Sequence, residues 1–148
     1  MKHLLSFLTL ILTLTVSGMA QKCNVNGSGL AIEGYDPVAY FTTGKAVEGS
    51  KEYSATIDGA TYHFTNSQNR DLFKAAPAKY QPQYGGWCAY AMGAKGQKVE
   101  VDPQTFKVLD GKLYLFYNKY FNNTLKLWNK DEAGLKAKAD VNWGKQSK

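Results

Sequence analysis

The sequence predicts one α+β domain, in which two antiparallel β-hairpins form a small sheet packed with several short helices. Two Asp-Gly pairs, Asp58-Gly59 and Asp110-Gly111, each lie between runs of alternating apolar and polar residues. Asp-Gly is a preferred two-residue hairpin turn, so each pair predicts a hairpin. Capping residues, apolar positions at helical spacing and stop residues recur between and after the hairpins, and these predict the helices.

The first twenty residues have the layout of a secretory signal peptide. Lys2-His3 precedes an apolar run over residues 4–16, and the small residues Gly18 and Ala20 occupy the cleavage positions. The run is shorter than the roughly 20 apolar residues that span a bilayer. We therefore expect cleavage after Ala20 and an extracytoplasmic protein, periplasmic or secreted. No second apolar run follows, so stable membrane insertion is not expected after cleavage.

The chain is basic, with a formal net charge of +6 at pH 7. Its lysines are spread along the sequence, which is typical of a solvated surface. Outside the cell, such a surface favours anionic polymers, lipid headgroups or envelope components over nucleic acid. The predicted partner is a metal ion or a small ligand, with no nucleic acid; the oligomeric state is left open.

Residues 21–29, rich in Asn and Gly, predict a flexible lead-in to a domain over residues 30–143. Asp36 followed by Pro37 is a helix start, because the carboxylate caps free amides and proline fixes φ at the first helical position. The first hairpin pairs residues 53–57 with residues 60–65. Its strand alternation places Tyr62 and Phe64 on the inner face and His63 on the outer face.

A helix capped by Asn66 or Ser67 is predicted to run to Ala76 and to stop at Pro77. A second short turn, residues 77–80, leads into the stretch over residues 80–92. That stretch carries most of the residues with candidate chemistry.

Beyond residue 92 we expect a loop at residues 93–98, a strand at 99–101 and a turn at Asp102-Pro103. The second hairpin pairs residues 106–109 with 112–117. Two helices are predicted after it, and a polar tail, residues 144–148, is predicted to fray. Asn118 caps the first of these helices, and the apolar residues at helical spacing in the two helices are Phe121, Leu125, Trp128, Leu135, Ala139 and Trp143.

Residues 80–92 (YQPQYGGWCAYAM) place a single thiol, Cys88, directly behind Gly85-Gly86 and among aromatic rings. The paired glycines allow a tight turn and a close backbone approach. The following residues have too few polar side chains for a solvated loop, so they predict a short buried helix or strand. A thiol in this place can be a metal ligand, a nucleophile or a small core residue.

Four segments resemble the YHS-domain family, and in particular its longer, exported, stand-alone members. They are residues 34–41 (GYDPVAYF), 69–73 (NRDLF), 80–89 (YQPQYGGWCA) and 110–115 (DGKLYL), and the likeness extends to Trp143. The resemblance implies metal handling, because short relatives are attached to metal transporters. Those relatives carry cysteines where this chain has Ala39, Thr65 and Asn69, so a soft-metal site here depends on Cys88.

Three classes of function use these residues. Cys88, His63 and Asp36 supply the ligand types that suit a copper or zinc ion. The same three types can support nucleophilic catalysis, but no enzyme signature accompanies them, and a non-enzymatic role is favoured. The third class is an aromatic-lined binding module without metal. Its candidate ligand-binding residues are Tyr35, Tyr84, Gly85, Gly86 and Trp87.

The interpretation that these observations favour is binding of a soft metal ion or a small ligand, centred on Cys88. An oxidising compartment invites a disulfide between Cys23 and Cys88. Cys23 lies in the predicted lead-in, close to the new N-terminus, and this position favours a free Cys88 thiol instead.

Overall fold

One strand, β4 (Lys112–Phe116), separates two hydrophobic cores in the computed structural model, which describes residues 22–148. Leu113 and Leu115 pack into the first core, whereas Tyr114 and Phe116 pack into the second. Successive side chains of a strand point to opposite faces, so this alternation buries both faces of β4. The predicted signal peptide, residues 1–20, lies outside the described residues.

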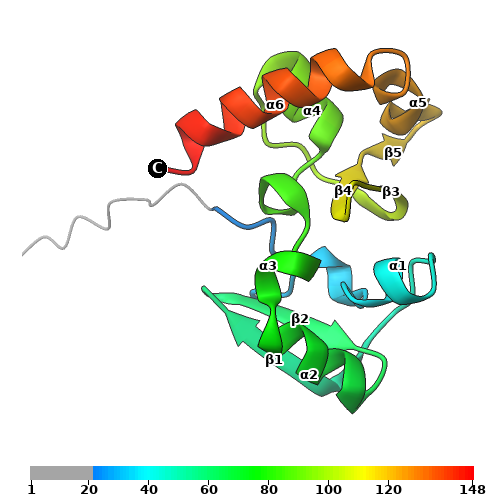
Figure 1. Cartoon of the computed structure of the whole chain (residues 1–148), viewed down its shortest axis with the longest axis vertical. Helices are drawn as coiled ribbons and strands as arrows, with labels where there is room; N and C mark the ends of the chain where they lie inside the picture. The colour runs from blue at the N-terminus through cyan, green and yellow to red at the C-terminus, as the bar shows by residue number, and fades with distance from the viewer. Residues whose placement is uncertain (1–21) are drawn as a thin grey trace, which may run out of the picture.

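The first core contains the predicted N-terminal hairpin, β1 (Ser50–Ile57) and β2 (Ala60–Phe64). At its turn Asp58 has φ 51° and Gly59 has φ 79°, which is the type I′ geometry expected for Asp-Gly. Tyr62 and Phe64 are buried and His63 is half-buried, so the predicted facing of this strand is confirmed. In Figure 1 this hairpin lies at the end of the molecule opposite α4, α5 and α6.

Three short helical segments complete this half of the molecule. They are η1 (Ile32–Gly34), α1 (Ala39–Thr42) and α2 (Ser67–Ala75). The Asn66 side chain caps α2 by accepting a hydrogen bond from the Asn69 amide, as predicted. Pro77 then opens α3 (Pro77–Tyr80), and both boundaries agree with the sequence signals.

The stretch around Cys88 consists of a glycine turn and a helix. The turn η2 (Gln83–Gly86) has positive φ at Tyr84, Gly85 and Gly86, and α4 (Ala89–Lys95) follows it. The loop predicted at residues 93–98 begins only at residue 96, because α4 continues to Lys95 and ends at Gly96, which has φ 63°. Residue 93 within this helix is a glycine, which allows a close approach to the helix that contains Leu135. A Cβ at residue 93 would overlap the Leu135 carbonyl.

The second hairpin joins β3 (Asp102–Leu109) to β4, with Asp110-Gly111 in its turn. The turn predicted at Asp102-Pro103 is wrong, because Asp102 already pairs with Phe116 and opens the strand. An irregularity in the register follows between Asp102 and Phe106, where a proline is tolerated. Residues 99–101, predicted as a strand, belong to no strand.

The helix predicted from Asn118 is also wrong. Residues 118–123 instead form a third, minimal hairpin, β5 (Asn118–Lys119) with β6 (Asn122–Asn123), and Asn123 caps a shorter helix, α5 (Thr124–Trp128). Asn-Asn is a poor helix interior and a good cap, because its side chains compete for backbone hydrogen bonds. Phe121 therefore leaves the apolar row of the helix and becomes fully exposed.

The last helix, α6 (Glu132–Gln146), packs along α4 and buries Leu135 and Ala139, as predicted. It also includes most of the tail that was expected to fray. Asn142 donates a side-chain hydrogen bond to the Met92 carbonyl, and Gln146 donates one to the Gly96 carbonyl. The C-terminal carbonyls of α4 thus acquire partners from α6.

The α+β class is confirmed, but within residues 22–148 the hairpins form three separate two-stranded sheets and not one small sheet. The described part of the lead-in is bound to the body as well. The Asn24 amide donates a hydrogen bond to the Gly85 carbonyl, and Val25 forms an isolated bridge with Ala31. Among the described residues, no helix has the length and apolar character needed to cross a membrane.

Candidate functional site

Cys88 lies at the junction of the two cores, at the residue that precedes α4. Its amide donates a hydrogen bond to the Val99 carbonyl at 2.9 Å, and its own carbonyl accepts the Met92 amide of the first helical turn. The side chain is completely buried. The turn residues before it and the helix after it therefore hold the sulfur in one position.

The thiol takes part in a closed ring of hydrogen bonds with Tyr117 and Thr124. The Tyr117 amide donates to the Cys88 Sγ at 3.4 Å, and the Thr124 hydroxyl donates to the Tyr117 carbonyl at 2.7 Å. The remaining side of the ring is a 3.5 Å contact between the Cys88 Sγ and the Thr124 Oγ1, in which either atom can be the donor. The sulfur thus has two hydrogen-bonding neighbours within the fold, Tyr117 and Thr124.

A cavity of about 230 Å³ lies above this ring, and we call it the Cys88 pocket. Its residues come from α4, from the segment that follows α4, and from the β4–α5 connection. They are Cys88, Tyr90, Ala91, Lys95, Gln97, Val99, Tyr117, Asn122 and Thr124. Since Cys88 is completely buried, it lies beneath the floor of the pocket, and the other side chains form its walls.

The walls combine apolar surface with a few polar groups. Ala91 and Val99 are aliphatic, and Tyr90 and Tyr117 are half-buried aromatic residues. Of the nine described lining residues, Lys95 alone carries a charge. The pocket therefore presents one ammonium group beside amides and hydroxyls, an arrangement that favours a small anion with a short apolar body.

The structure gives Asp36 a different role from metal binding. Its carboxylate is buried, and Oδ1 accepts the amides of Val38 at 2.9 Å and Ala39 at 3.3 Å. It therefore caps the first turn of α1, as predicted, although the helix begins at Ala39 and not at Pro37. Oδ2 accepts the Thr65 amide and hydroxyl and the Asn69 side-chain amide. Five hydrogen bonds occupy this carboxylate.

His63 lies on the outer face of β2, opposite Ser54 of β1 and beside Gly34. Within residues 22–148, no three His, Cys, Asp or Glu side chains are grouped closely enough to hold a metal ion. Cys88, His63 and Asp36 are thus not brought together, and the hydrogen-bond partners of the Cys88 sulfur include neither of the others. The two cysteines of this part of the chain are both free thiols.

The predicted aromatic residues are divided among several places. Tyr84 and Gly85 line a second cavity, of about 340 Å³, together with Asp140 and Trp143. The Tyr84 hydroxyl donates to Asp140 at 2.8 Å, and burial together with this carboxylate raises the pKa of Tyr84. Burial alone would raise the pKa of Asp140, but hydrogen bonds from Lys136 and Tyr84 outweigh it and lower that pKa.

The other aromatic candidates have structural surroundings. Tyr35 is half-buried, and its hydroxyl accepts a hydrogen bond from the Gln104 side chain. Trp87 is buried, and its indole N–H has no acceptor among residues 22–148. Gly86 has φ 84° and is buried against Pro82 and Asn24, which makes it a turn residue.

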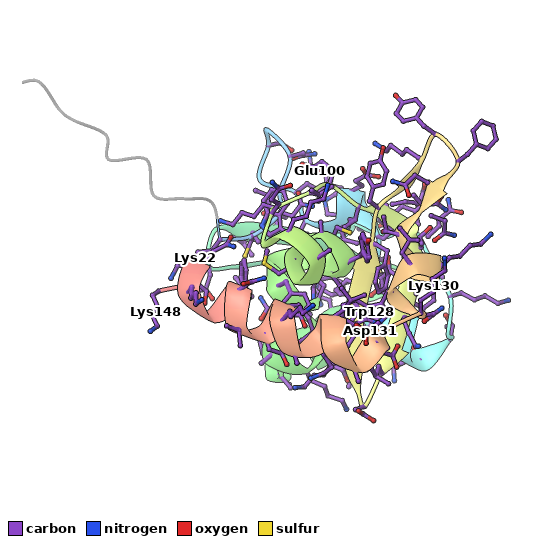
Figure 2. The ribbon with its side chains drawn as sticks, turned by 90° about the horizontal axis from the view of Figure 1, so that it is seen from above. Lys22, Glu100, Trp128, Lys130, Asp131 and Lys148 are labelled. Atoms are coloured by element: carbon purple, nitrogen blue, oxygen red, sulfur yellow. The ribbon has the colours of Figure 1, made fainter. Side chains whose placement is uncertain are left out.

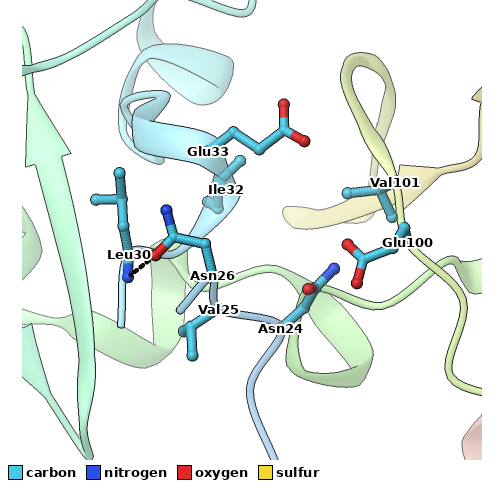
Figure 3. A pocket seen from close by; sticks show the side chains of 8 residues that line it. All are labelled: Asn24, Val25, Asn26, Leu30, Ile32, Glu33, Glu100 and Val101. Carbon is cyan, nitrogen blue, oxygen red and sulfur yellow. Dashed lines mark hydrogen bonds between the residues drawn. The ribbon is translucent and has the colours of Figure 1, made fainter. Parts of the chain in front are cut away.

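A third cavity, of about 170 Å³, lies where the lead-in meets η1. In Figure 3 Glu33 lies at the top of the view and Glu100 at its right, with Asn24 beside Glu100 and Asn26 on the left. The Asn26 side chain accepts a hydrogen bond from the Leu30 amide and shapes the loop. Two carboxylates without a third acidic, histidine or cysteine neighbour do not form a metal centre in the described part of the chain.

Comparison with protein-family models, with curated proteins and with solved structures finds no match to this chain. The likeness to YHS domains therefore stays a prediction.

Sequence reasoning identified Cys88 but missed the residues that surround it. Thr124 was expected inside a helix and Lys95 in a loop; Gln97 does lie in a loop, but its place beside Cys88 was not predicted. The Asn122-Asn123-Thr124 triplet was the available signal, because consecutive asparagines before a threonine are typical of a cap and not of a helix interior.

Proposed function

We propose that this protein is a non-enzymatic, extracytoplasmic binding protein, and that its ligand is a small organic anion held in the Cys88 pocket. The observation that carries the proposal is a cavity in which Lys95 is the one charged group of the described lining, beside two tyrosines and two side-chain amides. Pockets for drug-sized ligands measure about 300–1,000 Å³. At about 230 Å³, this pocket suits a smaller molecule, of the size of an aromatic carboxylate.

The metal-ion version of the prediction has less support. It needs further ligands around the sulfur, whereas the hydrogen-bond partners of the Cys88 sulfur are Tyr117 and Thr124, and Asp36 already accepts five hydrogen bonds. A thiol-dependent enzyme has less support as well, because within residues 22–148 the partners of the sulfur do not include His63. We therefore assign Cys88 to the support of the pocket.

The experiment uses 4-hydroxybenzoate and inorganic phosphate as probes and follows backbone amide signals by NMR. We expect saturable shifts at Ala91, Val99 and Tyr117 with the aromatic anion. Lys95→Gln should weaken this binding about tenfold, because it removes a charged hydrogen-bond donor. Lys45→Gln changes an exposed lysine outside the pocket and serves as the matched control.

Cys88→Ser separates the supporting role from thiol chemistry. A serine hydroxyl donates and accepts as the thiol does, so anion binding should remain within about threefold of the parent. If the folded serine variant loses an ability to bind copper or zinc that the parent has, the metal-ion version is correct. An absence of saturable shifts at the pocket with both probes would overturn the small-anion proposal.

A further inference from the structure

The tip of the β5–β6 hairpin presents two aromatic rings to solvent. Tyr120 is 89% exposed and Phe121 is 110% exposed, the highest values among the large hydrophobic residues of the described chain. No ring contact involves either residue within residues 22–148. In Figure 2 the hairpin stands out from the body, at the side of the view on which Lys130 is labelled.

The backbone of this tip is unfavourable for the residues that it carries. Tyr120 has φ 52° and Phe121 has φ 61°, the left-handed conformation that bulky L-residues avoid. The other two hairpins use the same geometry with Asp-Gly, which suits it. Within residues 22–148 these rings are exposed and take part in no ring contact, so nothing in this part of the chain accounts for aromatic residues at a strained turn.

The charges around the tip indicate which contact would account for these rings. The segment that carries the tip, residues 117–130, contains three lysines and no acidic residue: Lys119, Lys126 and Lys130. Lys119 directly precedes the tip, and Lys126 follows it in α5; both are exposed. Aromatic rings beside lysines are the combination that binds the interfacial layer of an anionic membrane, where rings enter the headgroup region and ammonium groups contact phosphates.

We propose that Tyr120, Phe121 and the lysines near them form a docking element for an anionic lipid surface. The rings lie in the interfacial layer, and the small size of the hairpin limits the contact to its tip. The attachment is peripheral and reversible, and it places the mouth of the Cys88 pocket near the membrane, because Asn122 of the same hairpin lines that pocket. The proposal does not depend on what the pocket binds.

Sedimentation with vesicles tests this. We expect the protein to bind vesicles of phosphatidylglycerol mixed with phosphatidylcholine, to bind phosphatidylcholine alone much less, and to dissociate as salt rises. Changing Tyr120→Asn together with Phe121→Gly creates a preferred turn, so the fold is kept while the rings are lost. Its partition coefficient should fall at least about tenfold. Val141→Ser, at an exposed apolar residue of α6, should leave the coefficient unchanged.

Two further variants test the charge and the depth of the tip. Lys119→Gln should lower the partition coefficient about fivefold, whereas Lys51→Gln, on the distant strand β1, should not. Phe121→Trp should keep binding, and its added fluorescence should be quenched by lipids brominated on their acyl chains. The quenching reports on residue 121 itself. It is therefore independent of the apolar residues 4–16, which all variants share.

Three outcomes would overturn the proposal: undiminished vesicle binding by the Asn-Gly variant, no quenching of the added tryptophan, or equal binding to neutral vesicles. If the parent instead self-associates in solution and the Asn-Gly variant does not, the tip is a contact with a second copy of this chain, and the lipid assignment is wrong.

Discussion

Asp36 illustrates how one side chain joins distant parts of this protein. A cap of α1 was predicted from the Asp-Pro pair, and the amides of Val38 and Ala39 bear it out. The second carboxylate oxygen binds Thr65 and Asn69, which lie 29 and 33 residues further along the chain. The carboxylate therefore fastens α1 to the end of β2 and to α2.

This arrangement predicts a large loss of stability for Asp36→Ala. A helix cap alone contributes about 0.5–2 kcal/mol. Because the substitution also leaves buried donors without an acceptor, we expect the free energy of unfolding to fall by about 3 kcal/mol. Denaturant titration measures this, with Asp71→Ala as control, since Asp71 is an exposed acidic residue of α2 that should change stability by less than about 0.5 kcal/mol. If Asp36→Ala lowers the free energy of unfolding by less than about 1 kcal/mol, the five hydrogen bonds to this carboxylate do not stabilise the fold as described.

At the scale of elements, the contact between α4 and α6 organises the second core. Gly93 of α4 faces the Leu135 carbonyl, and the close approach lets Asn142 and Gln146 reach the carbonyls at the end of α4. Gly144 of α6 has no neighbouring atom within 4 Å of where a Cβ would be. The two helical glycines thus differ in their surroundings and not in their local conformation.

Substitution of these glycines by alanine should have opposite effects. Gly93→Ala should destabilise the protein by about 1–3 kcal/mol, because the new methyl group forces the helices apart. Gly144→Ala should be neutral or stabilise it by up to about 1 kcal/mol, because alanine is the better helix former. Thermal unfolding of both variants checks the sign. Stabilisation by Gly93→Ala would show that the α4–α6 approach is looser than described.

At the scale of the whole molecule, tyrosines are a major component of both cores. Tyr40 and Tyr62 belong to the first core, and Tyr84 and Tyr114 to the second. Burial raises the pKa of each of these phenols. For Tyr62 the pKa rises from 10.0 to about 12, although the hydrogen bond from Gln81 partly opposes the effect of burial. Both cores therefore depend on neutral phenols.

Stability should consequently fall in alkali. Below about pH 10, Tyr62 is protonated in both the folded and the unfolded chain, and its contribution is complete. Between about pH 10 and 12 the unfolded chain releases the proton while the folded protein keeps it, so the free energy of unfolding decreases as pH rises. Denaturant titrations across this range should show a shallower decrease for Tyr62→Phe than for the parent. Tyr120→Phe changes an exposed phenol and should follow the parent.

The features that depend only on residues close together in the sequence could be predicted from the sequence. The Asp-Gly turns, the Asn66 cap, the stop at Pro77 and the facing of Tyr62 and Phe64 all follow from preferences within a few residues. The α+β class follows from their order. The sequence also singled out Cys88, because its glycine and aromatic neighbours are adjacent in sequence, and the structure places this residue beneath a cavity.

Only the tertiary structure decided which distant residues meet. The partners of the Cys88 sulfur are Tyr117 and Thr124, and Lys95, which lines the cavity, belongs to α4 because this helix continues past its predicted end. Phe121 matched a helical row, yet no core surface was available to bury it, and Asn123 could cap a shorter helix instead. Helical spacing specifies which side chains share a face, but whether that face is buried depends on contacts that local preferences do not encode.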